Sequence, residues 1–394
     1  MDAADPVKPK TSPLNDPSVR GVAYQLLLCG VIVYLVYGAI TNAIINLQRS
    51  KIASGFDFWN TTAGFDISQT LIEYSITSTY GRAFWVGLLN TLLVAAIGIV
   101  LATILGFAIG IARLSSNWLV ARLAGVYVEV IRNIPLLLQL LFWYNAVLQA
   151  LPEQLADSIL VPGGGYLNRR GLFLPQPVFG ESLVFAIVVL VVGCIAALAI
   201  RSWARRRQQR TGERTPVVSI ALVLIVVPPL AVLAMTGLQV DFVYPTPGRF
   251  NIQGGIEILP EFMALLIGLV TYTAAFIAEV VRAGLLAVSR GQAEAAYSLG
   301  LPRGPTLRLV VIPQAMRVII PPLTSQYLNL TKNSSLAVAI GYPDLVQIFA
   351  GTVLNQTGQA VEVLTVTMAV YLTISLVTSL LMNLYNRRVA LVER

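Results

Sequence analysis

Two short motifs place a carboxylate and an arginine one helical turn apart within apolar stretches. "EVIR" at 129–132 holds Glu129 and Arg132, and "EVVR" at 279–282 holds Glu279 and Arg282. Because positions i and i+3 are neighbours on a helix, each carboxylate can pair with its arginine and lower the cost of carrying charge near lipid. A free carboxylate that carries protons is the alternative. Ion pairing is the chemistry that this spacing favours.

Polar side chains also follow one another along a later apolar run. Gln326, Asn329 and Asn333 stand at i, i+3 and i+7, which puts them on one helix face, with Ser325 and Lys332 beside them. Such groups can contact a polar solute inside a membrane, and they can equally hold two packed helices together. The sequence leaves both interpretations open.

Pro135 interrupts the apolar run that begins with "EVIR". A proline removes a backbone donor, so we expect it to bend the helix and to free a carbonyl group near Ile131. The bend can be a hinge or a fixed kink. Gln139 lies just beyond the bend and is a further candidate for contact with a polar solute.

The residues that are missing exclude several classes of function. The 394 residues include no histidine, which removes imidazole proton relays and histidine metal sites. No G-x-x-x-x-G-K-[ST] stretch is present, so the chain cannot by itself hydrolyse a nucleotide. We therefore expect no catalytic residue, no cofactor and no metal site, and a membrane enzyme is poorly supported.

The elements that carry these residues are those of an integral membrane protein. The mean hydropathy is +0.74, and repeated apolar runs are long enough to cross about 30 Å of hydrocarbon. We expect an all-α membrane protein with about eight transmembrane helices. They lie near residues 22–46, 83–111, 124–150, 182–200, 216–236, 260–284, 319–341 and 361–385. The seventh carries Lys332 and several amides, and a soluble loop is its alternative.

Basic residues divide unevenly between the two sides that these spans define. With a cytoplasmic N-terminus, most of the 27 lysines and arginines fall in inner segments, so both termini are placed in the cytoplasm. The net charge of +8 then reflects topology and anionic lipid, and we expect no nucleic-acid partner. We interpret the cluster "RSWARRRQQRTGER" at 201–214 as a stop-transfer anchor, with a binding patch as the alternative.

The stretch "GQAEAAYSLGLPRGPTLRLVVIP" at 291–313 is polar, basic and broken by proline. Residues 292–299 are good helix formers, and Gly300 stands where a helix can end in a left-handed residue. Pro302 then stops that helix, and a second short helix can run up to Pro313. We expect two short helices at the membrane surface, with an ordinary amphipathic connector as the alternative.

One face of the first of these helices carries small side chains. Ala293, Ala296 and Leu299 share this face, where small residues would let the surface of another protein approach closely. Glu294 lies in the first turn, favourably placed relative to the helix dipole.

The same stretch resembles the EAA signature of ABC importer permeases, which reads Glu-Ala-Ala, three residues, Gly, nine residues, then Ile-x-Leu-Pro. Here "EAAYSLG" is followed by nine residues and "VVIP", with Val310 and Ile312 as conservative departures. Three blocks resemble the polar amino-acid uptake branch of that family, namely "AEVVRAGLLAVSRGQAEAAYSLGL", "RNIPLLLQL" and "LNLTKNSSL". Nearly the whole chain resembles the Q-type subunit of the general L-amino-acid permeases.

This resemblance implies a type I ABC importer permease core with an N-terminal extra helix and an inserted helix pair. The implied division is a cytoplasmic tail at 1–21, the first transmembrane helix and a periplasmic loop at 22–81, the permease transmembrane domain at 82–385 with an insertion at about 151–257, and a cytoplasmic tail at 386–394. The chain would lie in the inner membrane of a bacterium.

The resemblance also implies a mechanism. The 292–300 helix would dock in a groove of a separate cytoplasmic ATPase, and closure of two ATPase subunits on ATP would drag two permease subunits from inward-open to outward-open. A periplasmic binding protein would deliver L-amino acids, and the second permease subunit is expected to be a paralogue. The residues implied in ATPase coupling are Glu294, Ala295, Ala296, Gly300 and Pro313.

These residues do not specify which amino acid is transported. Family members for cationic amino acids often carry Glu where this chain has Gln326, and the lost charge is compatible with broad specificity for polar amino acids. A self-sufficient secondary transporter or channel is the alternative function. Flux driven by an ion gradient without any ATPase would favour that alternative.

Overall fold

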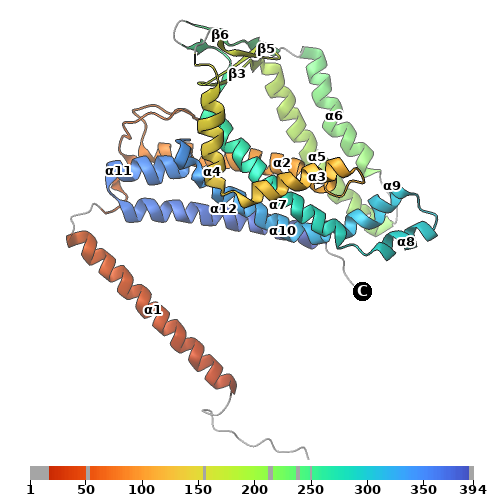
Figure 1. Ribbon diagram of the computed structural model, residues 1–394, viewed down its shortest axis with the longest axis horizontal. Coiled ribbons are helices and arrows are strands. Elements are labelled where there is room, and N and C mark those ends of the chain that lie inside the picture. Colours follow the sequence, from red (N-terminus) through yellow and green to blue (C-terminus); the bar gives the residue numbers. More distant parts are fainter. Residues whose placement is uncertain are drawn as a thin grey trace, which may run out of the picture. The chain divides into compact units, whose positions relative to one another are not determined.

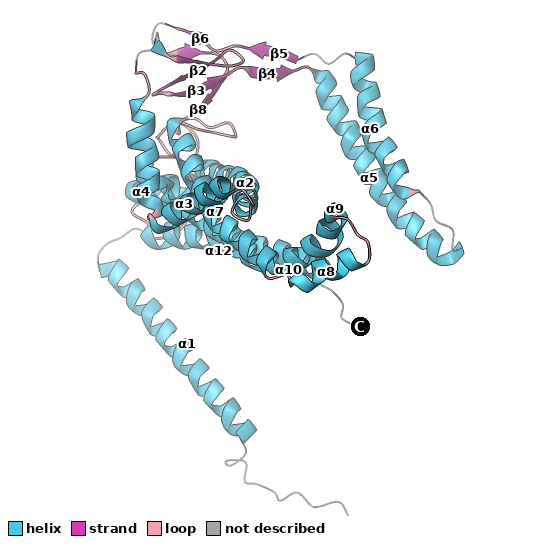
Figure 2. Ribbon diagram, turned by 45° about the vertical axis from the view of Figure 1, so that its right-hand side comes forward, coloured by secondary structure: helices cyan, strands magenta, loops and turns pink. Residues whose placement is uncertain are grey.

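The chain is mostly helical in the computed structural model, which describes residues 17–49, 54–153, 157–211, 216–236, 240–248 and 251–389 (Figures 1 and 2). The α-helices are α1 (Pro17–Arg49), α2 (Tyr80–Ala112), α3 (Trp118–Asn133), α4 (Leu136–Leu141), α5 (Glu181–Thr211), α6 (Val217–Thr236), α7 (Pro260–Leu286), α8 (Arg290–Ser298), α9 (Arg303–Thr306), α10 (Ile312–Asn333), α11 (Leu354–Thr357) and α12 (Ala360–Val389). Tighter or wider helical turns are η2 (Asp57–Asn60), η3 (Phe142–Val147), η4 (Leu148–Ala150), η6 (Leu307–Val311), η7 (Ser334–Ile340) and η8 (Val346–Val353).

Length and hydropathy identify the helices that can cross a membrane. Within the described residues there are 7, or up to 8 if a bent pair of helices counts as one span. They are Arg20–Asn42, Tyr80–Ala112, Phe185–Gln208, Ser219–Thr236, Pro260–Leu286, Arg303–Ile340 and Ala360–Asn386, with the bent pair at Trp118–Asn133 and Leu136–Ala150. Seven of the expected spans are confirmed, and the expected third span is the bent pair. The seventh is a helix, not a loop, and it begins earlier than the sequence suggested.

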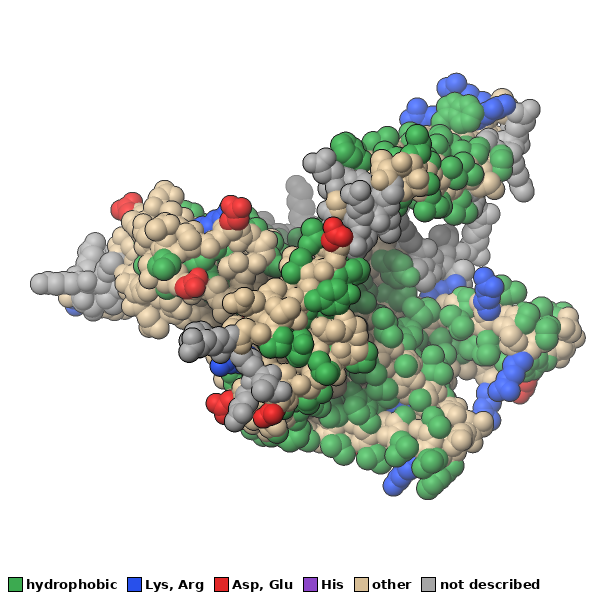
Figure 3. All heavy atoms as spheres, turned by 90° about the horizontal axis from the view of Figure 1, so that it is seen from above, with side chains coloured by type: hydrophobic (Ala, Val, Ile, Leu, Met, Phe, Trp, Pro, Cys, Tyr) green, Lys and Arg blue, Asp and Glu red, His purple; other side chains and the backbone are tan. Residues whose placement is uncertain are grey.

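Hydrophobic side chains remain exposed over much of these helices, as Figure 3 shows. Leu26, Ile104, Leu198 and Leu372 are each about 60% exposed or more, which would be costly in water. In a bilayer, lipid chains cover such surfaces.

Short strands occur where only helices and loops were expected. The strands in the described part of the chain are β1 (Ile159–Val161), β2 (Gly165–Asn168), β3 (Gly171–Leu174), β4 (Gln176–Phe179), β5 (Val240–Val243), β6 (Thr246–Pro247), β7 (Ile252–Gln253) and β8 (Ile256–Ile258). They form antiparallel sheets of order β1-β2-β3-β8, β4-β5 and β6-β7.

The strands pair because α5 and α6 form a hairpin, so the chain that leaves α6 returns to the end at which it entered α5. β4 precedes α5 and β5 follows α6, so Val178 pairs with Asp241 and, further out, Phe173 pairs with Glu257. Neither segment alone has a regular alternating pattern, and the pairing therefore depends on the long-range contact.

Contacts divide the chain into two compact units, residues 1–90 with 343–377 and residues 91–342 with 378–394. The first unit has an aromatic core. The ring centroids of Trp59 and Phe84 lie 5.1 Å apart, and those of Phe84 and Phe349 lie 5.3 Å apart. A side chain at Gly81 would clash with Trp59, because a Cβ there would lie 2.4 Å from the indole nitrogen. The glycine therefore lets the indole pack on α2.

Asp344 is a buried carboxyl group in this first unit, between two of the candidate membrane spans. It is 1% exposed, and it accepts the Gln347 N–H at 2.8 Å and the Tyr371 hydroxyl at 3.3 Å. Burial raises the pKa of Asp344 to about 7, although the hydrogen bonds from Gln347, Val346 and Tyr371 act in the opposite direction. The folded protein therefore holds a proton that the unfolded chain releases at much lower pH.

Because the folded state holds this proton more tightly, we expect the free energy of unfolding to fall as the pH rises from about 4 to about 7. Below the unfolded pKa of 3.8 both states hold the proton; above it only the unfolded chain ionises, until the folded carboxyl ionises near 7. The shift corresponds to about 4 kcal/mol. Thermal unfolding in detergent measures it, with Asp344→Asn as the control that keeps the shape and cannot titrate. Parallel pH profiles for the two proteins would contradict this prediction.

Candidate functional site

The EAA loop, residues 290–311, begins with a helix that ends at a left-handed glycine. α8 terminates where Gly300 adopts a φ of +79°. The Gly300 N–H donates to Tyr297 O at 2.9 Å and the Leu301 N–H to Ala296 O at 3.1 Å, which is the Schellman pattern. The expected helix end at Gly300 is confirmed. The chain leaves α8 in one defined direction.

Side-chain contacts hold α8 on the elements that follow it. Ala296 is 4% exposed, and α8 packs against α9 and η6. Gln314 Nε2 donates to Gln292 Oε1 at 3.2 Å, and the Thr306 hydroxyl donates to Leu301 O at 3.3 Å. α8 is therefore attached to the base of α10.

The burial of Ala296 corrects the face that the sequence suggested for a partner. The small residue lets α8 approach its own chain, so its side chain is not offered outward. Ala293 is half-buried, while Leu299 is 82% exposed. The outward face instead carries Glu294 and Ala295, both exposed, followed by Leu299.

Pro313 lies inside a longer helix, not at the end of a short one. The helical stretch from Arg303 runs through η6, α10 and η7 to Ile340 as a single span of 38 residues. η6 is a π-type turn, and Pro313 stands in the first turn of α10 directly after it. Pro313 has no N–H to donate back along this helix, and the wider turn of η6 directly before it accommodates its ring. The second short helix that the sequence suggested is therefore the base of the seventh span.

A second polar site begins where α2 packs closely against α7. A Cβ on Gly106 would lie 2.6 Å from Ile277 Cβ, and one on Gly110 would lie 2.8 Å from Ala278 O. The two glycines therefore let the helices approach closely. The next polar residues along each helix, Arg113 and Glu279, meet at the end of this contact.

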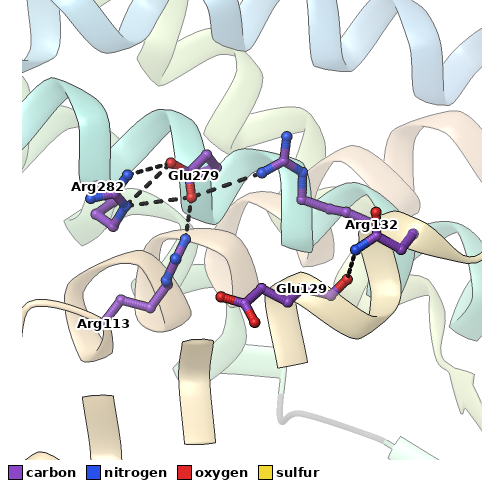
Figure 4. Close-up of polar contacts among 6 residues, drawn as sticks. Arg113, Glu129, Arg132, Glu279 and Arg282 are labelled. Carbon is purple, nitrogen blue, oxygen red and sulfur yellow. Dashed lines mark hydrogen bonds and ion pairs between the residues drawn. The ribbon is translucent and has the colours of Figure 1, made fainter. Parts of the chain in front are cut away.

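Three arginines converge on Glu279, and we call these four residues the Glu279 cluster (Figure 4). Arg282 donates from Nη2 to Oε1 at 2.6 Å and from Nε at 3.2 Å, and Arg113 donates to Oε2. Arg132 Nη1 lies 3.9 Å from Oε2, and its guanidinium stacks on Phe276 at 5.0 Å. One carboxylate therefore joins α2, α3 and α7.

The pairing expected within "EVVR" is confirmed, and the one expected within "EVIR" is not. Arg132 reaches across to Glu279, while the exposed Glu129 makes no side-chain hydrogen bond or ion pair with any described residue. Figure 4 shows its carboxylate without a contact drawn to it. Arg132 has a better partner on α7 because Glu279 is partly buried, with 27% of its side chain exposed. The ion pair between Arg113 and Glu279 was not predicted, because the two residues are 166 positions apart in the sequence and no local pattern links them.

The break at Pro135 is a bend of 105° between the helical segments on either side of it. α3 ends at Asn133, Ile134 is extended, and α4 begins at Leu136. Gln139 Nε2 donates to Ile131 O and to Ile134 O, both at 2.9 Å. The carbonyl expected to be freed near Ile131 is thus satisfied by Gln139. These bonds engage the amide nitrogen of Gln139, while its Oε1 is buried and has no hydrogen-bond partner among the described residues, so its contact with a solute stays a prediction.

Five polar side chains lie along α10, and we call them the polar stripe. They are available for contact with a solute or another subunit. Ser325, Asn329 and Lys332 are exposed, and Gln326 and Asn333 are half-buried. None of the five side chains makes a hydrogen bond or ion pair within the described part of the chain. They remain candidates for solute contact or for contact with another subunit.

Known proteins match this chain in sequence, including the EAA loop. The family described as "Binding-protein-dependent transport system inner membrane component" matches residues 191–391. The General L-amino acid transport system permease protein AapQ of Rhizobium johnstonii is 51% identical over 383 residues, covering 97% of this chain and 95% of that protein. The chain is a permease subunit of the amino-acid ABC transporter family.

Two further relatives of this permease span nearly the same length. The putative amino-acid ABC transporter permease protein YhdX of Escherichia coli is 50% identical, covering 96% of each chain. The glutamate/glutamine/aspartate/asparagine transport system permease protein BztB of Rhodobacter capsulatus is 43% identical, covering 97% of this chain and 96% of that protein. The permease is therefore a multi-pass membrane transport subunit and not an enzyme, and its family implies ATPase and binding-protein partners.

Proposed function

We propose that this permease translocates L-amino acids from the periplasm to the cytoplasm by alternating access, driven by a separate ATPase that docks on α8. The observation that carries this proposal is the outward face of α8, where Glu294, Ala295 and Leu299 are exposed on a helix attached to α10. A movement of α8 caused by the ATPase would be transmitted to α10 through the Gln292–Gln314 hydrogen bond and the bend at Gly300, because these contacts connect the two helices directly.

The proposed assembly has two cytoplasmic ATPase subunits, a second permease subunit that is a paralogue of this one, and a periplasmic binding protein. Both termini and the EAA loop would be cytoplasmic, in agreement with the distribution of basic residues. The absence of a phosphate-binding loop from the sequence supports this division of labour.

The proposed substrates are polar L-amino acids over a broad range. The relatives named for general L-amino acids and for glutamate, glutamine, aspartate and asparagine support this range. The stripe on α10 offers amides, a hydroxyl and Lys332, which can bind the carboxylate that all amino acids share. We propose that Gln326, Asn329 and Lys332 contact the substrate on its path.

Replacing Glu294 by Lys is expected to reduce ATP-driven uptake more than tenfold, because the exposed carboxylate would no longer complement the ATPase groove. The transporter, reconstituted in liposomes with its ATPase, binding protein and second permease, is assayed with radiolabelled amino acids. Glu73→Lys is the control, since Glu73 is also exposed and its side chain lies in a loop of the other unit. Normal uptake by Glu294→Lys contradicts the coupling role.

The same liposomes test the alternative function. We expect no amino-acid flux when the ATPase is omitted and an ion gradient is applied. Flux under those conditions supports a self-sufficient secondary transporter or channel and overturns the proposed mechanism.

A further inference from the structure

A groove of about 760 Å³ runs along the hairpin of α5 and α6, and its lining includes no residue of the EAA loop or the Glu279 cluster. Its floor includes Ala197 and Ala204, both buried, and its walls include Leu198 and Leu222, both more than half exposed. Arg201 and Gln208, with Ala204 between them, line the half of the groove toward the C-terminal end of α5 and its arginine cluster. The groove is therefore apolar along its length and polar at one end.

Residue size explains why the groove forms between these two helices. They are in close contact at Gly193, where a Cβ would lie 2.4 Å from Leu224 O. Beyond that point the facing residues include Ala197 and Ala204 on α5 and Ala221 on α6. These side chains are too short to fill the space that the close contact leaves on either side.

Hydrocarbon, not water, is the medium around this hairpin. Phe185–Gln208 and Ser219–Thr236 are candidate membrane spans with mean hydropathies of 2.5 and 2.4. Only 6% of the apolar window of α6 is buried within the protein. A groove with such walls inside a bilayer is filled by lipid chains, because leaving it empty would forfeit dispersion contacts.

The polar end of the groove carries residue types that are typical of a membrane–water interface. Arg201 follows the apolar run of α5 and makes no hydrogen bond or ion pair with any residue that the structure describes. Trp203 follows two residues later, with Arg207 stacked on its ring at 5.4 Å. Tryptophan and arginine mark the membrane–water interface, where a basic pocket between helices suits a phosphate group.

We propose that the α5–α6 groove binds one anionic phospholipid, with an acyl chain along Ala197 and Leu222 and its phosphate at Arg201. Charge complementarity selects an anionic lipid, because Arg201 has no carboxylate partner in the described chain and further arginines follow it on α5. From Cys194 to Arg201 the helix rises about 10 Å, so a lipid with its headgroup at Arg201 reaches well into the groove. The site is independent of the ATPase coupling proposed above.

Native mass spectrometry of the full-length permease in detergent tests this site, with dioleoylphosphatidylglycerol as the anionic probe and dioleoylphosphatidylcholine as the zwitterionic one. We expect one phosphatidylglycerol to bind at concentrations where phosphatidylcholine does not. Arg201→Gln should weaken this binding at least tenfold. The matched control is Arg206→Gln, which removes the same charge from α5 outside the groove lining and should change binding less than twofold.

A second variant tests the apolar part of the groove. Ala197→Phe fills the floor and should abolish binding, provided that the protein still elutes as a single species. Inorganic phosphate in large excess should leave phosphatidylglycerol bound, because the free ion cannot make the acyl-chain contacts. Equal losses for Arg201→Gln and Arg206→Gln, equal binding of the two lipids, or displacement by phosphate each overturn the proposal.

Discussion

Replacing Glu279 by Gln is expected to destabilise the permease by about 2–4 kcal/mol. The change removes the only carboxylate that the described structure shows in contact with Arg113, Arg132 and Arg282, and the three guanidiniums then repel one another. Breaking a fully buried ion pair costs about 3–5 kcal/mol, and the partial exposure of Glu279 places the expected loss somewhat lower. Thermal unfolding followed by size-exclusion chromatography in detergent measures the effect.

The "EVIR" motif provides a matched control for this experiment. Glu129→Gln makes the same chemical change at the same place in the repeated motif, but Glu129 is exposed and without an ion pair among the described residues. We expect a change within about 0.5 kcal/mol, as for most surface substitutions. Equal losses in the two variants would show that Glu279 does not join the three helices as described.

Replacing Gly300 by Val is expected to reduce ATP-driven uptake more than tenfold while the protein remains in the membrane. A side chain at Gly300 meets nothing within 4 Å, so space does not oppose the substitution. The opposition comes from the backbone, because a φ of +79° is strained for a β-branched residue by about 1–2 kcal/mol or more. A helix as short as α8 is marginal by itself, so this strain would redirect the chain after Ser298.

A substitution at Gly304 in the same loop is the control that distinguishes the effect of backbone strain from the effect of replacing any glycine of this loop. It also has open space around it, but it lies in α9 and has no positive φ. Gly304→Val should therefore retain uptake within about twofold. Copurification with the ATPase provides the second readout, in which only Gly300→Val should lose the partner. Equal uptake by the two variants would contradict the role of the left-handed bend.

Local residue patterns were sufficient for the parts of the permease whose structure depends on neighbours in the chain. Apolar length predicted the spans, because crossing about 30 Å of hydrocarbon requires a fixed number of helical residues. Gly300 predicted the end of α8, because few other residues tolerate a left-handed conformation. Pro135 predicted the break between α3 and α4, because its ring excludes an intrahelical hydrogen bond.

Contacts between distant segments decided the rest. Arg132 had a carboxylate three residues away and paired instead with Glu279, since a partly buried charge attracts more strongly than an exposed one. Ala296 faces α9 and η6 because α8 buries one of its faces against the chain that follows. The sequence of α8 did not indicate whether this chain or another protein would cover that face.

The sequence by itself thus determined the membrane-spanning segments, the end of α8 and the family of this permease, because each rests on runs or motifs that are local in the chain. Only the tertiary structure decided the pairing of β3 with β8, the three arginines around Glu279 and the exposed face of α8. Each of these depends on segments brought together by packing, and the geometry of that packing is set by which helices and strands meet.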